Sequence, residues 1–326
     1  MIEKLFWQQT ATVRFGEEYS EFFPVKMGVR QGCVLSTKLF NLYAKKIFNE
    51  SDELPGCVVG GENLNNLRYA DDTALLAESE SALQDIVDVV RQNSEEKGLS
   101  MNVKKTKTMV VCRDETPDVR IMVNGQVLEQ VKKFKYLGQW ITDDGRCECE
   151  IKNRIEIARS TFIKMRDVLT SRKLHLEIRK RLVRCYVLST FLYASESWTL
   201  DKQMEDKINA FEMWIFRRMF KISHLDRKTN LEVLEMAKAK QTLLRTIQER
   251  KLQYFGHLIR GKGKQKLLME GKIEGTRRKG KQRRTWTSDV TDWCGSSYTK
   301  CVRMAENRKE WSSMAADLLI RRWHRQ

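Results

Sequence analysis

Proline, histidine and cysteine are scarce in this chain of 326 residues. It has only three prolines and four histidines. The prolines are Pro24, Pro55 and Pro117, so no proline interrupts a helix in the remainder of the chain. The eight cysteines are scattered and too few for a disulfide scaffold. We therefore expect a mainly helical second half and a reducing compartment, nuclear or cytoplasmic.

Long apolar runs and familiar catalytic motifs are also missing. The longest apolar candidate, residues 186–194, is broken by Ser189 and Thr190 and is shorter than the roughly 18 residues that a bilayer crossing needs. The cysteines lack the pairing with histidines that is typical of zinc sites. No phosphate-binding loop and no Ser-His-Asp pattern occurs. These absences predict no membrane partner and no small-molecule cofactor.

Charge of one sign gathers in the second half. The whole chain has 60 Lys and Arg against 43 Asp and Glu, a formal net charge of +17. Residues 1–150 carry a net −5, whereas residues 151–326 carry +22. Such an excess is self-repulsive, and a polyanionic partner such as nucleic acid is its usual physical reason. Solvated helix faces are the alternative explanation.

The basic excess is greatest at residues 260–285, a glycine-containing stretch. Its candidate nucleic-acid-binding residues are Arg277, Arg278, Lys279, Lys281, Arg283 and Arg284. This composition indicates a flexible arm that contacts phosphates without reading sequence, and it also fits a nuclear-localisation stretch. Nearby tryptophans, at 286, 293, 311 and 323, could stack on bases, although helix packing explains them at least as well.

Hydrophobic periodicity predicts an α+β chain. Short strands are expected at residues 12–15, 22–25, 100–103, 108–112 and 120–123, with two more meeting near residues 70–72. Helices are expected at about 32–48 and 81–97. In the second half they are expected at 151–169, 176–194, 204–220, 230–258 and 301–323. No internal repeat is visible.

Two adjacent aspartates, Asp71 and Asp72, stand in an apolar, strand-forming context after Tyr69 and Ala70. Burying bare carboxylates there would be costly unless a cation sat on them. A divalent metal is the natural partner, and at a tight strand turn only one of the two needs to face a cleft. An Asp-Asp pair also often marks nothing more than an exposed turn.

Four blocks in order resemble the reverse transcriptase domain of non-LTR (LINE-type) retrotransposons. Gly28-Val29-Arg30-Gln31-Gly32 and the residues up to Tyr43 resemble its motif B, and Tyr69-Ala70-Asp71-Asp72 its catalytic motif C. Residues 98–108 resemble motif D, and Phe134-Lys135-Tyr136-Leu137-Gly138 resembles motif E. The likeness continues through residues 192–198 and 250–257, so it spans essentially the whole chain.

The resemblance implies RNA-templated DNA synthesis by Mg²⁺-dependent nucleotidyl transfer, with RNA and RNA–DNA duplex as partners. Asp71 and Asp72 would be catalytic residues and Mg²⁺ ligands, and Lys105 would be a cation or general acid near the departing pyrophosphate. Lys105 could equally be one of several solvated lysines. By the same resemblance, the substrate-binding residues would be Arg30, Gln31, Gly32 and Tyr69. Tyr69 would pack beneath the active site. Tyr136, Leu137 and Gly138 would form the primer grip, a hairpin that holds the primer end.

The same resemblance predicts a partial palm at 1–140, a helical thumb at 141–259, the basic arm at 260–285 and a helical segment at 286–326. The family's motif A aspartate, which faces motif C across the metals, has no counterpart upstream of Gly28, and the fingers and an endonuclease are missing too. Thr37 replaces the usual proline. We therefore expect little or no polymerase activity from the isolated chain. A non-catalytic RNA- or DNA-binding protein is the alternative function.

Overall fold

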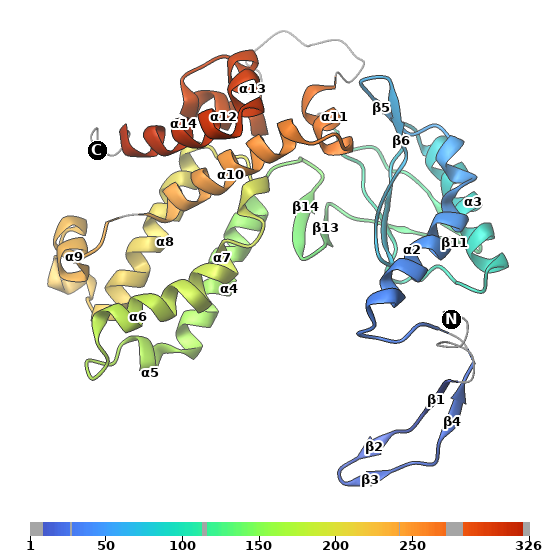
Figure 1. The fold of residues 1–326 in the computed structure, drawn as a ribbon, viewed down its shortest axis with the longest axis horizontal. Coiled ribbons are helices and arrows are strands. Elements are labelled where there is room, and N and C mark those ends of the chain that lie inside the picture. Colours follow the sequence, from blue (N-terminus) through green and yellow to red (C-terminus); the bar gives the residue numbers. More distant parts are fainter. Residues whose placement is uncertain (1–8, 27, 113–115, 241, 272–282, 322–326) are drawn as a thin grey trace. The chain divides into compact units, whose positions relative to one another are not determined.

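The computed structural model describes residues 9–26, 28–112, 116–240, 242–271 and 283–321, with side chains up to residue 317. These residues belong to two compact units. The first lies within 1–58, 63–108 and 119–129, and the second within 59–62, 109–118 and 130–326. Helices and short strands occur together (Figure 1), so the predicted α+β class is confirmed.

The described strands form two-stranded pairs and do not join into one sheet. The pairs are β1 (Gln9–Ala11) with β4 (Phe23–Val25), β2 (Arg14–Phe15) with β3 (Glu18–Tyr19), β5 (Cys57–Val59) with β6 (Glu62–Leu64), β7 (Asn66–Tyr69) with β8 (Asp72–Leu75), β9 (Lys107–Thr108) with β12 (Glu129–Gln130), β10 (Met122–Val123) with β11 (Gln126–Val127), and β13 (Lys133–Tyr136) with β14 (Gln139–Thr142). Each strand has only two to four residues. The palm and thumb assignments therefore stay predictions.

Two helices organise the core of the first unit. They are α2 (Val34–Phe48) and α3 (Glu80–Glu96), which pack against each other, and the 3-10 turn η1 (Ser51–Glu53) follows α2. The Ser79 hydroxyl accepts a hydrogen bond from the Ala82 amide at the start of α3, and Gly98, at φ +71°, lets the chain turn after its end. The buried face of α3 contributes Ile86, Val87 and Val90 to two small apolar clusters.

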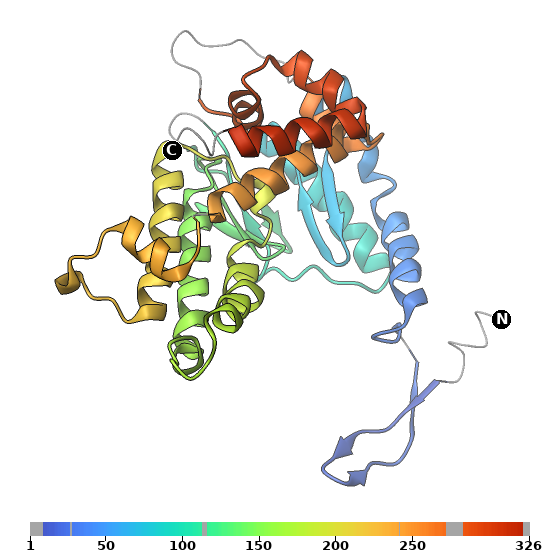
Figure 2. The ribbon, with the colours of Figure 1, turned by 60° about the vertical axis from the view of Figure 1, so that its left-hand side comes forward.

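Helices dominate the second unit. They are α4 (Glu148–Lys164), α5 (Arg166–Leu169), α6 (Leu176–Leu182), the π-helix η2 (Val183–Leu188), α7 (Ser189–Phe191), η3 (Ser195–Ser197), α8 (Lys202–Phe220), η4 (His224–Asp226), α9 (Asn230–Ala237), α10 (Leu243–Arg260), α11 (Lys264–Glu270), α12 (Trp286–Cys294), α13 (Tyr298–Glu306) and α14 (Arg308–Arg321). Helix α10 packs against α8, α12, α13 and α14 (Figures 1 and 2). One large apolar cluster runs from α4 to α14. None of the described helices is long and apolar enough to cross a membrane.

Several predicted element boundaries are wrong, for local backbone reasons. No strand forms at residues 100–103, where Asn102 instead begins a turn that accepts hydrogen bonds from the Lys105 and Thr106 amides. The helix predicted at 151–169 is interrupted at Met165. The one predicted at 230–258 is split because Lys238 adopts φ +45° and ends α9. The one predicted at 301–323 is split at the extended residue Asn307.

The tryptophans near the basic arm pack inside the helical unit. Trp293 and Trp311 are buried, and the Trp311 Nε1 donates to the Leu252 carbonyl oxygen at 2.8 Å. The Trp286 Nε1 donates to the Glu196 carbonyl oxygen at 2.8 Å. For these three residues the helix-packing interpretation is confirmed, and Trp323 lies outside the described residues.

Candidate functional site

The two aspartates sit at the tip of a tight hairpin. Strands β7 and β8 pair with Tyr69 opposite Asp72, which leaves a two-residue turn made by Ala70 and Asp71. Ala70 adopts φ +53°, a left-handed conformation that residues with a Cβ seldom adopt. Strain of this kind is frequent at functional sites. The sequence prediction of two strands meeting at this motif is confirmed.

Both carboxylates are open to solvent. Asp71 and Asp72 are exposed, and within the described residues neither carboxylate makes a hydrogen bond or an ion pair. The expected desolvation cost, which would have demanded a cation, is therefore absent. Tyr69, expected beneath the active site, is 66% exposed. No group of three or more His, Cys, Asp or Glu side chains that could hold a metal occurs in the described parts of the chain.

The residues resembling motif B form a loop before α2. Gly28 and Gly32 adopt φ +98° and +83°, conformations that glycine enters without steric cost. The Arg30 Nε donates to the Gln9 side-chain oxygen at 3.1 Å, and its carbonyl accepts from the Ser36 hydroxyl at 2.6 Å. Gln31 and Gly32 are exposed just ahead of the helix. The helix expected at about 32–48 thus begins at Val34.

Lys105 lies in the turn before β9. Its backbone amide donates to Asn102, while its side chain is exposed. Its neighbour Lys107 is engaged differently, in an ion pair with Glu129 at 2.6 Å. Among the described residues, no hydrogen bond or ion pair joins Asp71 or Asp72 to Lys105 or Gln31. Within the described residues these predicted partners therefore have no direct polar link.

The predicted primer grip is a second hairpin, and it is part of the helical unit. Strands β13 and β14 pair with Tyr136 opposite Gln139, so Leu137 and Gly138 form the two-residue turn. Both turn residues have left-handed backbones, at φ +48° and +79°. A turn of two residues with positive φ matches the right-handed twist of paired strands.

Three side chains that the sequence reading missed hold this second turn. The Arg154 Nη2 donates to the Gly138 carbonyl oxygen at 2.5 Å, and the Tyr193 hydroxyl donates to the Leu137 carbonyl oxygen at 3.0 Å. The Trp140 amide donates to the Glu150 carboxylate at 2.8 Å. The sequence offered one signal of this arrangement: Glu150 and Arg154 are four residues apart on α4, a spacing at which opposite charges on a helix form an ion pair.

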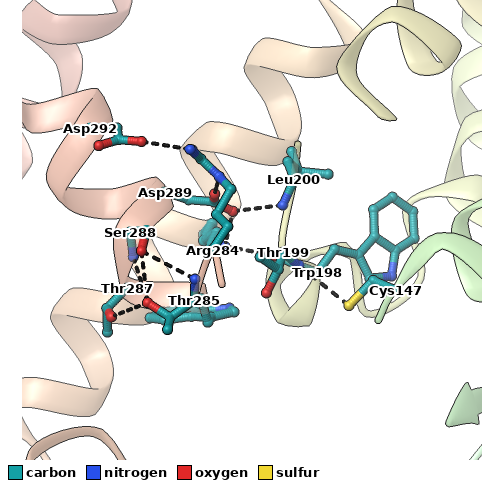
Figure 3. A network of polar contacts seen from close by, with 12 residues as sticks. Cys147, Trp198, Thr199, Leu200, Arg284, Thr285, Thr287, Ser288, Asp289 and Asp292 are labelled. Atoms are coloured by element: carbon teal, nitrogen blue, oxygen red, sulfur yellow. Dashed lines mark hydrogen bonds and ion pairs between the residues drawn. The ribbon is translucent and has the colours of Figure 1, made fainter. Parts of the chain in front are cut away.

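The described end of the basic arm is tied to its own unit. The Arg283 Nη1 donates to the Asp144 carbonyl oxygen at 2.6 Å. Arg284 pairs with Asp289 and Asp292, each at 2.7 Å (Figure 3). These contacts stabilise the start of α12. Arg277, Arg278, Lys279 and Lys281 lie outside the described residues.

Asp289 also receives a buried lysine that the sequence did not reveal. The Lys251 side chain is fully buried, and its ammonium contacts the Asp289 carboxylate and the Trp198 carbonyl oxygen. Besides Lys251 and Arg284, Asp289 accepts a hydrogen bond from the Leu200 amide at 2.9 Å, which Figure 3 shows. Burial lowers the pKa of Lys251 to about 8, against the opposing pull of Asp289. This cluster joins α10 and α12 to the segment that precedes α8.

Known proteins resemble this chain over two different spans. Residues 1–141 match the family model for reverse transcriptase (RNA-dependent DNA polymerase). An uncharacterized transposon-derived protein of Caenorhabditis elegans is 29% identical over 273 residues, which cover 78% of this chain and 95% of that protein.

Longer relatives are proteins of mobile elements. The RNA-directed DNA polymerase from mobile element jockey of Drosophila melanogaster is 24% identical over 61% of this chain and 22% of its own length. The Pol polyprotein of the retrotransposable element R2 of Nasonia vitripennis is 29% identical over 41% of this chain and 14% of its own length. This chain thus spans 22% and 14% of the lengths of those two proteins. Its residues 1–141 are a reverse transcriptase domain of the kind that non-LTR, LINE-type retrotransposons encode.

Proposed function

We propose that this protein binds RNA and RNA–DNA hybrid, and that its Asp71 and Asp72 are one acidic half of a nucleotidyl-transfer site. The turn of β7 and β8 carries the proposal. It presents two adjacent exposed carboxylates from a strained backbone, in a domain related to RNA-directed DNA polymerases. Exposure leaves both carboxylates free to meet a ligand that arrives from solvent.

The other predicted residues would have supporting roles around that turn. The Gln31–Gly32 loop has no bulk at its glycine, so a template or nucleotide can approach the backbone closely. The exposed Lys105 ammonium can approach a leaving pyrophosphate and donate a proton to it. The turn at Leu137 and Gly138 would contact the primer end.

Polymerisation by the 326-residue chain alone is not part of the proposal. Mg²⁺ in this family would neutralise the triphosphate and activate the primer hydroxyl. Two carboxylates do not make a site for two such ions, and the described residues offer no third acid beside them. We infer that the chain expressed by itself has little or no polymerase activity.

Primer extension tests this inference. We expect the purified 326-residue chain, with an RNA template, a DNA primer and Mg²⁺, to add no nucleotides above the level of Asp71→Asn. Extension by the wild-type chain that is abolished by Asp71→Asn would show that the site is complete and the inference wrong.

The charge of the helical half favours a second function, non-catalytic binding of nucleic acid. Residues 151–326 carry 41 basic against 19 acidic residues. Phosphate contacts of this kind release counterions, so affinity for hybrid should fall about 10³-fold or more between 50 and 200 mM salt if six or more contacts form. Fluorescence anisotropy across that range measures the slope. A flat salt dependence would exclude this function.

A further inference from the structure

The turn at Leu137 and Gly138 is held in an unfavourable backbone conformation. Leucine at φ +48° has its Cβ crowded by the backbone, and such a residue persists only where its surroundings stabilise it. The Leu137 side chain is 37% exposed, so its own burial supplies only part of that stabilisation. The pairing of β13 with β14 and contacts to the backbone of the turn supply the rest.

Those contacts come from helix α4 and from the turn after α7, both in the same unit. The Arg154 guanidinium, on α4, reaches the Gly138 carbonyl and lies 4.5 Å from the centre of the Tyr193 ring. Tyr193, which follows α7, reaches the Leu137 carbonyl with its hydroxyl. Both carbonyls of the turn are therefore occupied by donors that also contact each other.

The donors are themselves fixed by a buried ion pair. The Arg154 Nε donates to the Glu150 carboxylate at 2.5 Å, and their side chains are only 9% and 3% exposed. The second carboxylate oxygen of Glu150 accepts from the Trp140 amide on β14. The pair thus contacts the hairpin at two places, the turn at Gly138 and the strand β14 at Trp140. Charged hydrogen bonds in a desolvated place are strong and leave little freedom of position.

We propose that Glu150, Arg154 and Tyr193 are positioning residues that fix the Leu137–Gly138 turn to the helices and thereby set where a primer 3′ end binds. The inference rests on the proposed role of this turn at the primer end. It adds that the end is located by α4 and Tyr193, so that the hairpin and the helices present one rigid surface to the hybrid.

Tyr193→Phe is the sharpest variant, because it removes one hydroxyl and keeps the ring beneath Arg154. Tyr186→Phe is its matched control: Tyr186 is also half-exposed in this unit, and its hydroxyl makes no hydrogen bond within the described residues. Arg154→Lys is the second variant. It keeps a charge beside Glu150 but lacks the fork that reaches Glu150 and Gly138 together.

The first measurement is amide hydrogen exchange of the 326-residue chain without nucleic acid. We expect exchange of residues 136–142 to accelerate about fivefold or more in Tyr193→Phe and Arg154→Lys, and to stay at the wild-type rate in Tyr186→Phe. Equal rates in all four proteins would overturn the proposal, because the turn would then not depend on these side chains.

The second measurement compares affinities for an RNA–DNA hybrid with a recessed DNA 3′ end and for a blunt hybrid of equal length. The wild type and Tyr186→Phe should prefer the recessed end, and Tyr193→Phe should lose about fivefold of that preference while its affinity for the blunt hybrid is unchanged. Retention of the full preference by Tyr193→Phe would refute the positioning role. A wild type without any preference would remove the primer-end role itself, even if hydrogen exchange shows that the turn is held.

Discussion

The two hairpins of this protein have the same construction and different surroundings. Each pairs two four-residue strands through a two-residue turn that contains a left-handed residue other than glycine. The turn at Leu137 is gripped by a buried ion pair and a tyrosine hydroxyl. The turn with Asp71 meets no such side chain among the described residues, and its carboxylates are exposed. Local sequence therefore suffices to form a hairpin, but neighbouring elements decide whether its tip is held.

The largest change in stability is expected when the buried ion pair that holds the second hairpin is removed. Arg154→Ala should lower the free energy of unfolding by about 3–5 kcal/mol, because Glu150 would remain buried without its partner. Lys152→Ala is the control on the same helix. Its pair with Glu148 is exposed, and its loss should cost under about 1 kcal/mol. Urea denaturation measures both, and similar losses in the two variants would show that burial does not distinguish the pairs.

The second expected effect is a dependence of stability on pH, and it arises at Lys251 in the helical unit. Lys251 has a folded-state pKa of about 8, below its unfolded value of 10.5. Between these pH values the unfolded chain binds a proton that the folded chain has released, so the stability due to this group should rise with pH. The gain should not exceed about 3 kcal/mol.

Lys251→Met isolates that contribution, because Asp289 keeps Arg284 as its partner. The difference in unfolding free energy between the wild type and Lys251→Met should shift in favour of the wild type from pH 8 to 10.5. Denaturation curves at a series of pH values give this difference. A difference that stays constant with pH would mean that Lys251 titrates at its ordinary value.

A smaller effect tests the strain in the first hairpin. Ala70→Gly should stabilise the turn by about 0.5–1 kcal/mol, since glycine adopts φ +53° without a Cβ clash and only one exposed methyl group is lost. Slower amide exchange along β7 and β8 would report the gain. Faster exchange would indicate that the flexibility of glycine in the unfolded chain outweighs the relief of strain.

The smallest effect is expected at the aspartates themselves. Asp71→Asn and Asp72→Asn should each change the stability by less than about 0.5 kcal/mol, because both side chains are exposed and form no hydrogen bond or ion pair with the described residues. Thermal unfolding of the two variants beside the wild type checks this. A loss of several degrees in either variant would reveal a structural role for that carboxylate, so that neutral variants could no longer test chemistry alone.

Much of the local structure was predictable from residue patterns. The hairpin at Ala70 and Asp71 and the helices α2, α3 and α8 follow from periodicity and turn chemistry. Boundaries were missed where one residue left the helical conformation, as Met165, Lys238 and Asn307 do. Met165 and Lys238 are residue types that helices accept, so no local signal marked those two breaks. Asn307 did offer one, because asparagine is favoured at a helix start and its side-chain oxygen accepts from the Lys309 and Glu310 amides.

What the sequence determined by itself is the order of the reverse transcriptase blocks, the α+β class and the uneven distribution of charge. These depend on composition and on short motifs, which can be recognised before any contact between distant residues is known. Tertiary structure alone decided that Arg154 grips Gly138, that Tyr193 reaches Leu137, and that Lys251 is buried on Asp289. Such partners are 16 to 56 residues apart in the sequence. Arginine and lysine are usually surface residues, so the burial of Arg154 and Lys251 and the partner of the Tyr193 hydroxyl follow only from packing.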